Sequence, residues 1–172
     1  MGLFSIRPIV TAYYQTLLEE SNSKSKVWLV FFAFPNVFSI ALVYIGILVT
    51  SDLIISLVSM LAILVGFSIN AMFLLVDSTS EDSDCKEKMT HSKDKADLYA
   101  GARKITHYSI IFGIISLLYI GLTLSIIESG LLPNSWFYKG ILTFITFFIF
   151  FHYIFTLLLL PARLYVVVEQ GY

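Results

Sequence analysis

Acidic residues are missing from the long apolar stretches of this sequence, and cysteine and proline are scarce throughout. Four runs, residues 27–49, 53–76, 109–127 and 137–160, contain no Asp or Glu. Exporters that exchange protons for small cations need a carboxylate inside the membrane, so this class is excluded. The single cysteine, Cys85, excludes an intrachain disulfide and a paired-thiol oxidoreductase. Only Pro35 lies where it would break a helix near mid-depth, which argues against transporters built from interrupted helices.

Charge is also low for a protein of this length. Charged residues make up 13% of the 172 residues, whereas soluble domains carry about 25%. Each of the four apolar runs is close to or longer than the roughly 20 residues that a helix needs to cross about 30 Å of hydrocarbon. The sequence therefore predicts an all-α polytopic membrane protein with four transmembrane helices. Its net charge of -1 gives no cationic surface for a nucleic acid partner.

The distribution of basic residues predicts the orientation in the membrane. Four spans place both termini and the central loop on one side of the bilayer. Of the eleven Lys and Arg residues, only Lys139 lies on the other side. Because basic residues accumulate on the cytoplasmic side, we expect a multi-pass protein of the inner (plasma) membrane with both termini cytoplasmic.

The chain divides into five segments. Residues 1–26 form an amphipathic interfacial segment and residues 27–76 a first transmembrane hairpin. Residues 77–104 form a charged cytoplasmic loop and helical stem, residues 105–160 a second hairpin, and residues 161–172 a cytoplasmic tail. The turn at Thr50, Ser51 and Asp52 is so short that the first two spans should be antiparallel neighbours. The fourth span is rich in large aromatic residues, for which lipid exposure is the simplest explanation.

An amphipathic helix is predicted before the first span. Its apolar residues recur at helical spacing, at Ile6, Ile9 or Val10, Tyr13 and Leu17, and Pro8 suits a first turn. Two interpretations remain open: the helix lies on the membrane surface, or it packs on the cytoplasmic end of its own protein.

The third span should extend into the cytoplasm as a stem. Ser92 suits the start of a helix, and one apolar side then continues into the span through Leu98, Ala102, Ile105 and Tyr108. We expect this side to pack on Tyr13 or Tyr14, or on a partner. Farther along, Gly121 and Ser125 give one face of small residues for helix packing.

Few polar residues lie inside the spans, and such residues are the usual indicators of function. Asn36, Asn70 and His152 share the depth of the inner leaflet and form a candidate intramembrane polar cluster. Such a cluster fixes helix packing through hydrogen bonds, or it lines a transport or relay path. Pro35 should kink the first span and free a carbonyl group that Asn36 or a neighbour satisfies. Cys85 and His91 match no zinc spacing, so we expect neither a metal nor a cofactor.

Three functions from different classes fit these features. The first is a non-enzymatic scaffold or sensor that self-associates in the lipid bilayer and recruits a soluble cytoplasmic protein, through a surface comprising Asp94, Asp97, Leu98, Arg103 and Lys104. The second is an oligomeric pore or depolarising effector lined by Thr143, Thr146, His152 and Thr156. The third is an interfacial lipid-modifying enzyme built from Asp97, Arg103 and His107.

The layout resembles a group of known proteins. The segment FSIRPIVTAYYQTLLEE leads into KSKVWLVFFAFP, and four spans with cytoplasmic ends and a charged central loop follow. This plan is similar to small membrane subunits encoded in bacterial anti-phage defence cassettes, such as the membrane member of the Kiwa system. The resemblance implies a non-enzymatic membrane component that senses infection or damages the membrane together with a soluble partner.

Overall fold

The computed structural model describes residues 6–21, 23–81, 92–130 and 135–169, and places the side chains of these except residues 19–20, 76–81, 92–99 and 162–169. Within these ranges the chain is helical except at its connections and forms no strand. The helices are α1 (Arg7–Ser21), α2 (Lys24–Trp28), the π-helical turn η1 (Leu29–Ala33), α3 (Phe34–Tyr44), α4 (Ser51–Glu81), α5 (Ser92–Glu128) and α6 (Trp136–Glu169).

Four helical stretches are long and apolar enough to cross a membrane, which confirms the all-α four-span architecture. They comprise Lys24–Tyr44, Ser51–Leu75, Ala100–Glu128 and Trp136–Pro161. The first stretch joins α2, η1 and α3 without a break. The helix of the fourth span, α6, continues beyond Pro161 to Glu169.

The first span ends earlier than the sequence pattern indicated. The helix stops at Tyr44, and Gly46 follows with a φ of 88°. The N–H of Gly46 bonds to the carbonyl of Val43, and the N–H of Ile47 bonds to that of Leu42, each at 3.0 Å. These two bonds form a Schellman motif, which favours glycine because its φ is positive. Residues 45–50 therefore form a connection rather than the end of the span.

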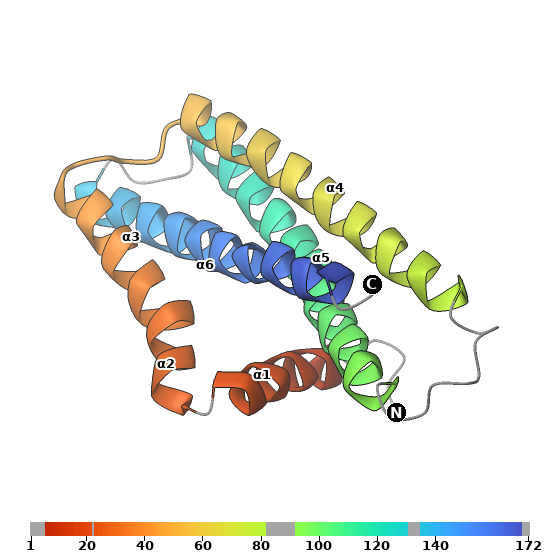
Figure 1. Ribbon diagram of the computed structural model, residues 1–172. Coiled ribbons are helices and arrows are strands. Elements are labelled where there is room, and N and C mark those ends of the chain that lie inside the picture. The colour runs from red at the N-terminus through yellow and green to blue at the C-terminus, as the bar shows by residue number, and fades with distance from the viewer. Residues whose placement is uncertain (1–5, 22, 82–91, 131–134, 170–172) are drawn as a thin grey trace.

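The spans do not pack as expected, because the first two spans are not neighbours. Within the described chain, α3 packs on α6 and α4 packs on α5, while α3 and α4 make no contact (Figure 1). The prediction that the first two spans are neighbours is wrong. Residues 45–50 join the two helices by passing α6, where the N–H of Val49 bonds to Oγ1 of Thr143.

The central helix of the bundle is α6, which contacts α3, η1, α4 and α5. In the apolar part of the fourth span 44% of the residues are buried, against 22–28% in the other three spans. Phe147 and Phe150 are buried in the core formed with α4 and α5. The expectation that lipid exposure explains the aromatic fourth span is therefore wrong for Phe147, Phe150 and Tyr153, which are buried between helices, whereas Phe137 and Tyr138 are exposed.

The N-terminal helix packs on its own protein. Helix α1 contacts α5 and α2, and Tyr13 and Leu17 are buried in a cluster with Ile105 and Tyr108. Of the two open interpretations, packing on the end of the same chain is the one that the structure shows. The predicted contact between the stem and Tyr13 is confirmed.

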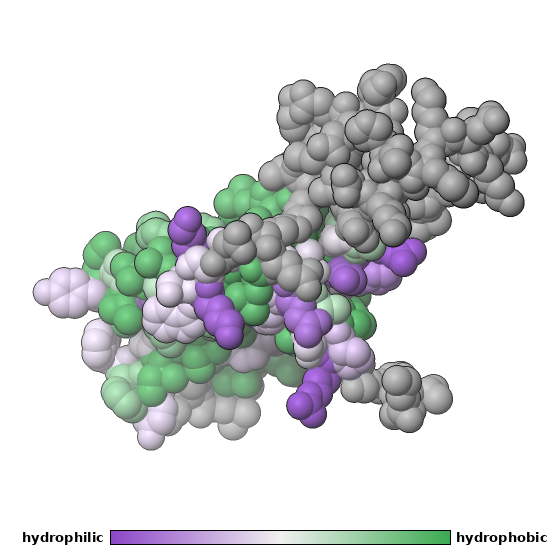
Figure 2. All heavy atoms as spheres, turned by 60° about the horizontal axis from the view of Figure 1, so that its bottom comes forward, coloured by the Kyte–Doolittle hydropathy of each residue, from purple (hydrophilic) through white to green (hydrophobic). Residues whose placement is uncertain are grey.

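We call the end of the bundle that carries α1 the α1 end. Three helices continue past their spans there: α4 runs on to Glu81, α5 begins at Ser92 and α6 reaches Glu169. The eight residues of α5 before Ala100 add about 12 Å of helix. Hydrophilic side chains gather at the surface of this end between apolar ones (Figure 2). Among the placed side chains, the charged ones at this end are all basic, namely Arg7, Lys24, Lys26, Arg103 and Lys104.

Candidate functional site

Among the predicted site residues whose side chains are placed, His152 is the most deeply buried titratable one. It lies on α6 with 4% of its surface exposed. Its Nδ1 atom is 2.7 Å from the carbonyl oxygen of Phe31, and its Nε2 atom is 3.2 Å from the hydroxyl of Tyr108. Because a carbonyl only accepts, Nδ1 carries the hydrogen, and Nε2 of the neutral ring accepts from Tyr108. One histidine thereby joins the first, third and fourth spans.

Proline explains why the Phe31 carbonyl is available. In an α-helix this oxygen would accept from the N–H of residue 35, but Pro35 has none. The backbone just before Pro35 widens into the π-helical turn η1, a feature frequent at functional sites. The neighbouring Phe32 carbonyl accepts from Nδ2 of Asn36 at 2.8 Å. Carbonyls just before Pro35 thus accept hydrogen bonds from side chains, and His152 is the donor that comes from another helix.

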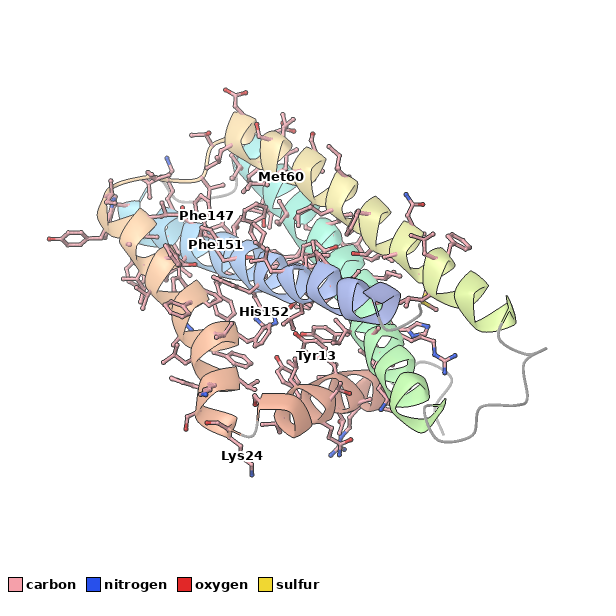
Figure 3. The ribbon with its side chains drawn as sticks, in the orientation of Figure 1. Tyr13, Lys24, Met60, Phe147, Phe151 and His152 are labelled. Carbon is pink, nitrogen blue, oxygen red and sulfur yellow. The ribbon has the colours of Figure 1, made fainter. Side chains whose placement is uncertain are left out.

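Tyr13 connects α1 to the same place. Its ring stacks on Tyr108 with centroids 3.9 Å apart and an interplanar angle of 10°. Its hydroxyl is within 3.4 Å of Oγ1 of Thr156, and Thr156 in turn donates to the His152 carbonyl at 2.9 Å. We call these five residues the His152 junction: Tyr13, Phe31, Tyr108, His152 and Thr156. Figure 3 shows Tyr13 and His152 between α1, α3 and α6.

The tyrosines that α1 contributes are in an environment that disfavours ionisation. Burial raises the pKa of Tyr13, a shift that the contact with Thr156 opposes and Tyr14 reinforces. Burial also raises the pKa of Tyr14, against a hydrogen bond with Tyr108. Both phenols are therefore held neutral where α1 meets the bundle.

An alkaline titration should reveal these two phenols. Because their pKa values are raised above the ordinary 10.0, their stabilisation of the docked helix is complete below pH 10.0 and is lost as pH rises through the folded-state values. Tyrosinate absorbance of Tyr13→Phe/Tyr14→Phe, subtracted from that of the wild type, should show ionisation only above pH 10.0. A difference curve with its midpoint at 10.0 would contradict the docked position of α1.

A second buried polar contact joins α4, α5 and α6. Oγ of Ser68 is 3.1 Å from Oγ of Ser109 and 3.4 Å from the hydroxyl of Tyr153. Beside them, Gly113 leaves room for the Tyr153 ring, since a Cβ atom there would lie 2.8 Å from that hydroxyl and 2.5 Å from Cγ2 of Val65. Ser109 and Gly113 are the small residues that the packing requires. The predicted pair, Gly121 and Ser125, is not closely packed, as a Cβ at Gly121 would meet nothing within 4 Å.

The structure does not bring the predicted polar cluster together. Asn70 is exposed on α4, which makes no contact with α3, the helix that carries Asn36. The amide of Asn36 is bonded within its own span. Only His152 bonds between helices, and its partners are a backbone carbonyl and Tyr108. A shared depth in the membrane was therefore not enough to predict a cluster, because the three residues lie on different faces of the bundle.

The residues considered as a pore lining are enclosed within one protomer. Thr143, Thr146 and Thr156 are each fully buried, as is nearly all of His152. Thr143 accepts the N–H of Val49 at 3.0 Å, while Thr146 has a buried hydroxyl without a hydrogen-bond partner. Three of the four are thus engaged in contacts inside the bundle.

The predicted partner surface is described only in part. Arg103 and Lys104 are exposed on α5, whereas the side chains of Asp94, Asp97 and Leu98 lie outside the described ones. For the interfacial enzyme, Nδ1 of exposed His107 is 3.0 Å from the Arg103 carbonyl. Asp97 cannot be placed beside them, and Cys85 and His91 also lie outside the described ranges. The placed residues contain no group of acidic, His and Cys side chains able to hold a metal ion.

Comparison with known proteins gives no guide to the role of these residues. No family model matches the sequence, and searches of curated proteins and of solved structures gave no match.

Proposed function

We propose that this protein is a non-enzymatic membrane scaffold or sensor subunit that self-associates and recruits a soluble cytoplasmic protein at its α1 end. The observation that carries the proposal is the attachment of α1 to α5 through the stacked rings of Tyr13 and Tyr108. Because α5 begins eight residues before its span and α1 packs near the start of that span, both helices would be accessible to a soluble protein at this end.

The asymmetry between the two ends supports this assignment. At the α1 end, α1 and three helices that continue past their spans are available to a partner. At the opposite end the spans are joined by residues 45–50 and 129–135 only. The exposed basic residues of the α1 end favour its cytoplasmic location, because basic residues accumulate on that side.

The His152 junction supplies a route by which the membrane would influence that surface. The π-helical turn before Pro35 interrupts the regular helix of the first span. His152 connects the Phe31 carbonyl in this turn to Tyr108, which stacks on Tyr13 of α1. A change in the bend of the first span would therefore shift the positions of α1 and the stem. The layout resemblance to anti-phage defence subunits supports infection as the setting in which such sensing operates.

Affinity purification tests the proposal. Full-length tagged protein, extracted in mild detergent from its native host, should retain a stoichiometric soluble protein. Arg103→Glu, on the exposed stem, should reduce recovery at least fivefold, because a reversed charge inside an interface leaves its counterpart unpaired. Lys24→Glu is the matched control, since Lys24 is also exposed and basic at this end but belongs to α2.

The outcomes separate the parts of the proposal. Recovery of a partner by the wild type and the control but not by Arg103→Glu supports recruitment by the stem. Equal recovery by all three places the partner elsewhere on the protein. Repeated recovery of the membrane protein alone, from cells grown with and without phage challenge, contradicts the recruiting function.

A further inference from the structure

A groove lies between α1 and α5 at the α1 end. It has a volume of about 260 Å³ and is lined by Pro8, Ile9, Ala12, Lys104 and His107. Three of these residues come from the first turns of α1 and form an apolar wall. The two from α5 are one turn apart and bring a cationic and a titratable nitrogen to the same groove. The groove therefore combines an apolar side with a basic side.

The groove lies near the start of the third span, which at 29 residues is longer than the roughly 20 that cross the hydrocarbon, so its first turns would lie at the level of the headgroups. Lys104 and His107 follow the start of the third span, Ala100, by four and seven residues. At 1.5 Å per residue these positions are about 6 and 10 Å along the helix. Lipid phosphates and glycerol groups occupy the region next to the hydrocarbon core. A lipid beside α5 would thus present its phosphate at the level of the groove.

Electrostatics at the groove favour an anion. The lining contains no acidic side chain, and the nearest charged neighbours along the placed parts of α1 and α5 are Arg7 and Arg103. The N-terminal turn of α1 also contributes the positive end of a 15-residue helix. The N–H groups of Ile9 and Val10 are already bonded to the carbonyl of Ile6. The hydrogen bonds to an anion would therefore come from side chains.

His107 is positioned to provide one of these hydrogen bonds. Its Nδ1 atom is bonded to the Arg103 carbonyl, which leaves Nε2 as the nitrogen available to a ligand. When the ring is protonated, Nε2 donates to a phosphate oxygen while Nδ1 keeps its carbonyl. The ammonium group of Lys104 provides the second contact.

We propose that this groove binds an anionic phospholipid, with Lys104 and His107 on the phosphate and Pro8, Ile9 and Ala12 against the glycerol and the first methylenes of an acyl chain. The volume is enough for that part of the lipid, and the rest of each chain remains in the bilayer. A free phosphate would leave the apolar wall unoccupied, which is why the occupant is a lipid. Binding at this place would link α1 to the stem from outside, as the His152 junction does from inside.

Native mass spectrometry of the purified full-length protein tests the site without any soluble partner. Phosphatidylglycerol and phosphatidylcholine with identical acyl chains are added in equal amounts. The wild type should retain phosphatidylglycerol preferentially. Lys104→Gln should weaken its apparent affinity about fivefold, since one basic residue near the membrane surface contributes about 1 kcal/mol. Lys104→Gln/His107→Gln should weaken it further, and Ala12→Phe should do so by filling the groove without changing the charge.

Lys24→Gln is the control, because it removes an exposed basic residue of the same end that does not line the groove; it should change the affinity less than twofold. Equal losses in Lys24→Gln and Lys104→Gln would overturn the site in favour of a diffuse charge effect. Equal retention of both lipids, or unchanged binding in Lys104→Gln/His107→Gln, would also overturn it. Displacement of the lipid by soluble glycerol phosphate at equal concentration would show a site for free anions. Variants are compared only where size-exclusion profiles match that of the wild type.

Discussion

His152→Leu should lower the free energy of unfolding by about 2 kcal/mol, although the side-chain volume is almost unchanged. The substitution removes the donor from the Phe31 carbonyl and the acceptor from the Tyr108 hydroxyl. A buried polar group left without a partner costs about 1–3 kcal/mol, and hydrogen bonds between membrane helices average about 0.6 kcal/mol. Two orphaned groups at those values account for the expected loss. Thermal and denaturant unfolding in lipid nanodiscs measures it.

A double-mutant cycle with Pro35→Ala identifies the cause. Alanine at position 35 restores a backbone N–H, which can bond to the Phe31 carbonyl in the ordinary helical pattern. His152→Leu should therefore cost about 1 kcal/mol less in the Pro35→Ala background than in the wild type. The same loss in both backgrounds would show that His152 acts through packing alone and that the free carbonyl is irrelevant.

Gly113→Ala should destabilise the protein by about 1–3 kcal/mol, the usual cost of overpacking a filled interior. The added Cβ would lie 2.5 Å from Cγ2 of Val65 and 2.8 Å from the hydroxyl of Tyr153. The Tyr153 ring is fully buried, and its hydroxyl contacts Ser68, so it has no free space to move into. Helices α4, α5 and α6 would have to separate. The same unfolding measurements apply.

Gly121→Ala is the matched control on the same helix. A Cβ at this position meets nothing within 4 Å, so the substitution should be neutral or stabilise by up to about 1 kcal/mol through helix propensity. Equal losses at the two glycines would indicate that α5 is sensitive to any substitution. The close approach at Gly113 would then lose its support.

Much of the architecture was readable from the sequence because hydrocarbon thickness sets the length of a span. All four spans were recognised, and the extension of α5 to Ser92 followed from a capping serine and an apolar stripe. The end of the first span was missed because apolar residues continue to Val49, although Gly46 already terminates the helix. A glycine followed by an apolar residue was the signal that could have placed that end.

The neighbours of each span were harder to predict, since hydropathy does not distinguish a buried apolar face from a lipid-facing one. Aromatic rings on α6 suited either environment, and only packing places Phe147 inside while Phe137 remains largely exposed. For the same reason the short connection after the first span suggested a contact with α4 that does not exist.

The candidate site was predicted in part. His152 was singled out as a polar residue in an apolar span, and Pro35 as the origin of a free carbonyl. The contact between His152 and the Phe31 carbonyl depends on the rotation of α6 against the first span, which one sequence does not encode as a readable pattern. Tyr13 and Tyr108 were placed on facing stripes, but Thr156 was assigned to a pore lining. Its depth close to His152 on one helix face was the available signal for its role in the junction.

The claim that the His152 junction couples the first span to α1 has one direct test. Hydrogen exchange of the full-length protein in lipid nanodiscs compares the wild type with His152→Leu, peptide by peptide. We predict a large increase in exchange in α1 and in the π-helical turn Leu29–Ala33, and only the smaller increase set by the lower global stability in the Ser51–Leu75 span. Unchanged exchange in α1, or an equal increase in the Ser51–Leu75 span, would contradict the coupling.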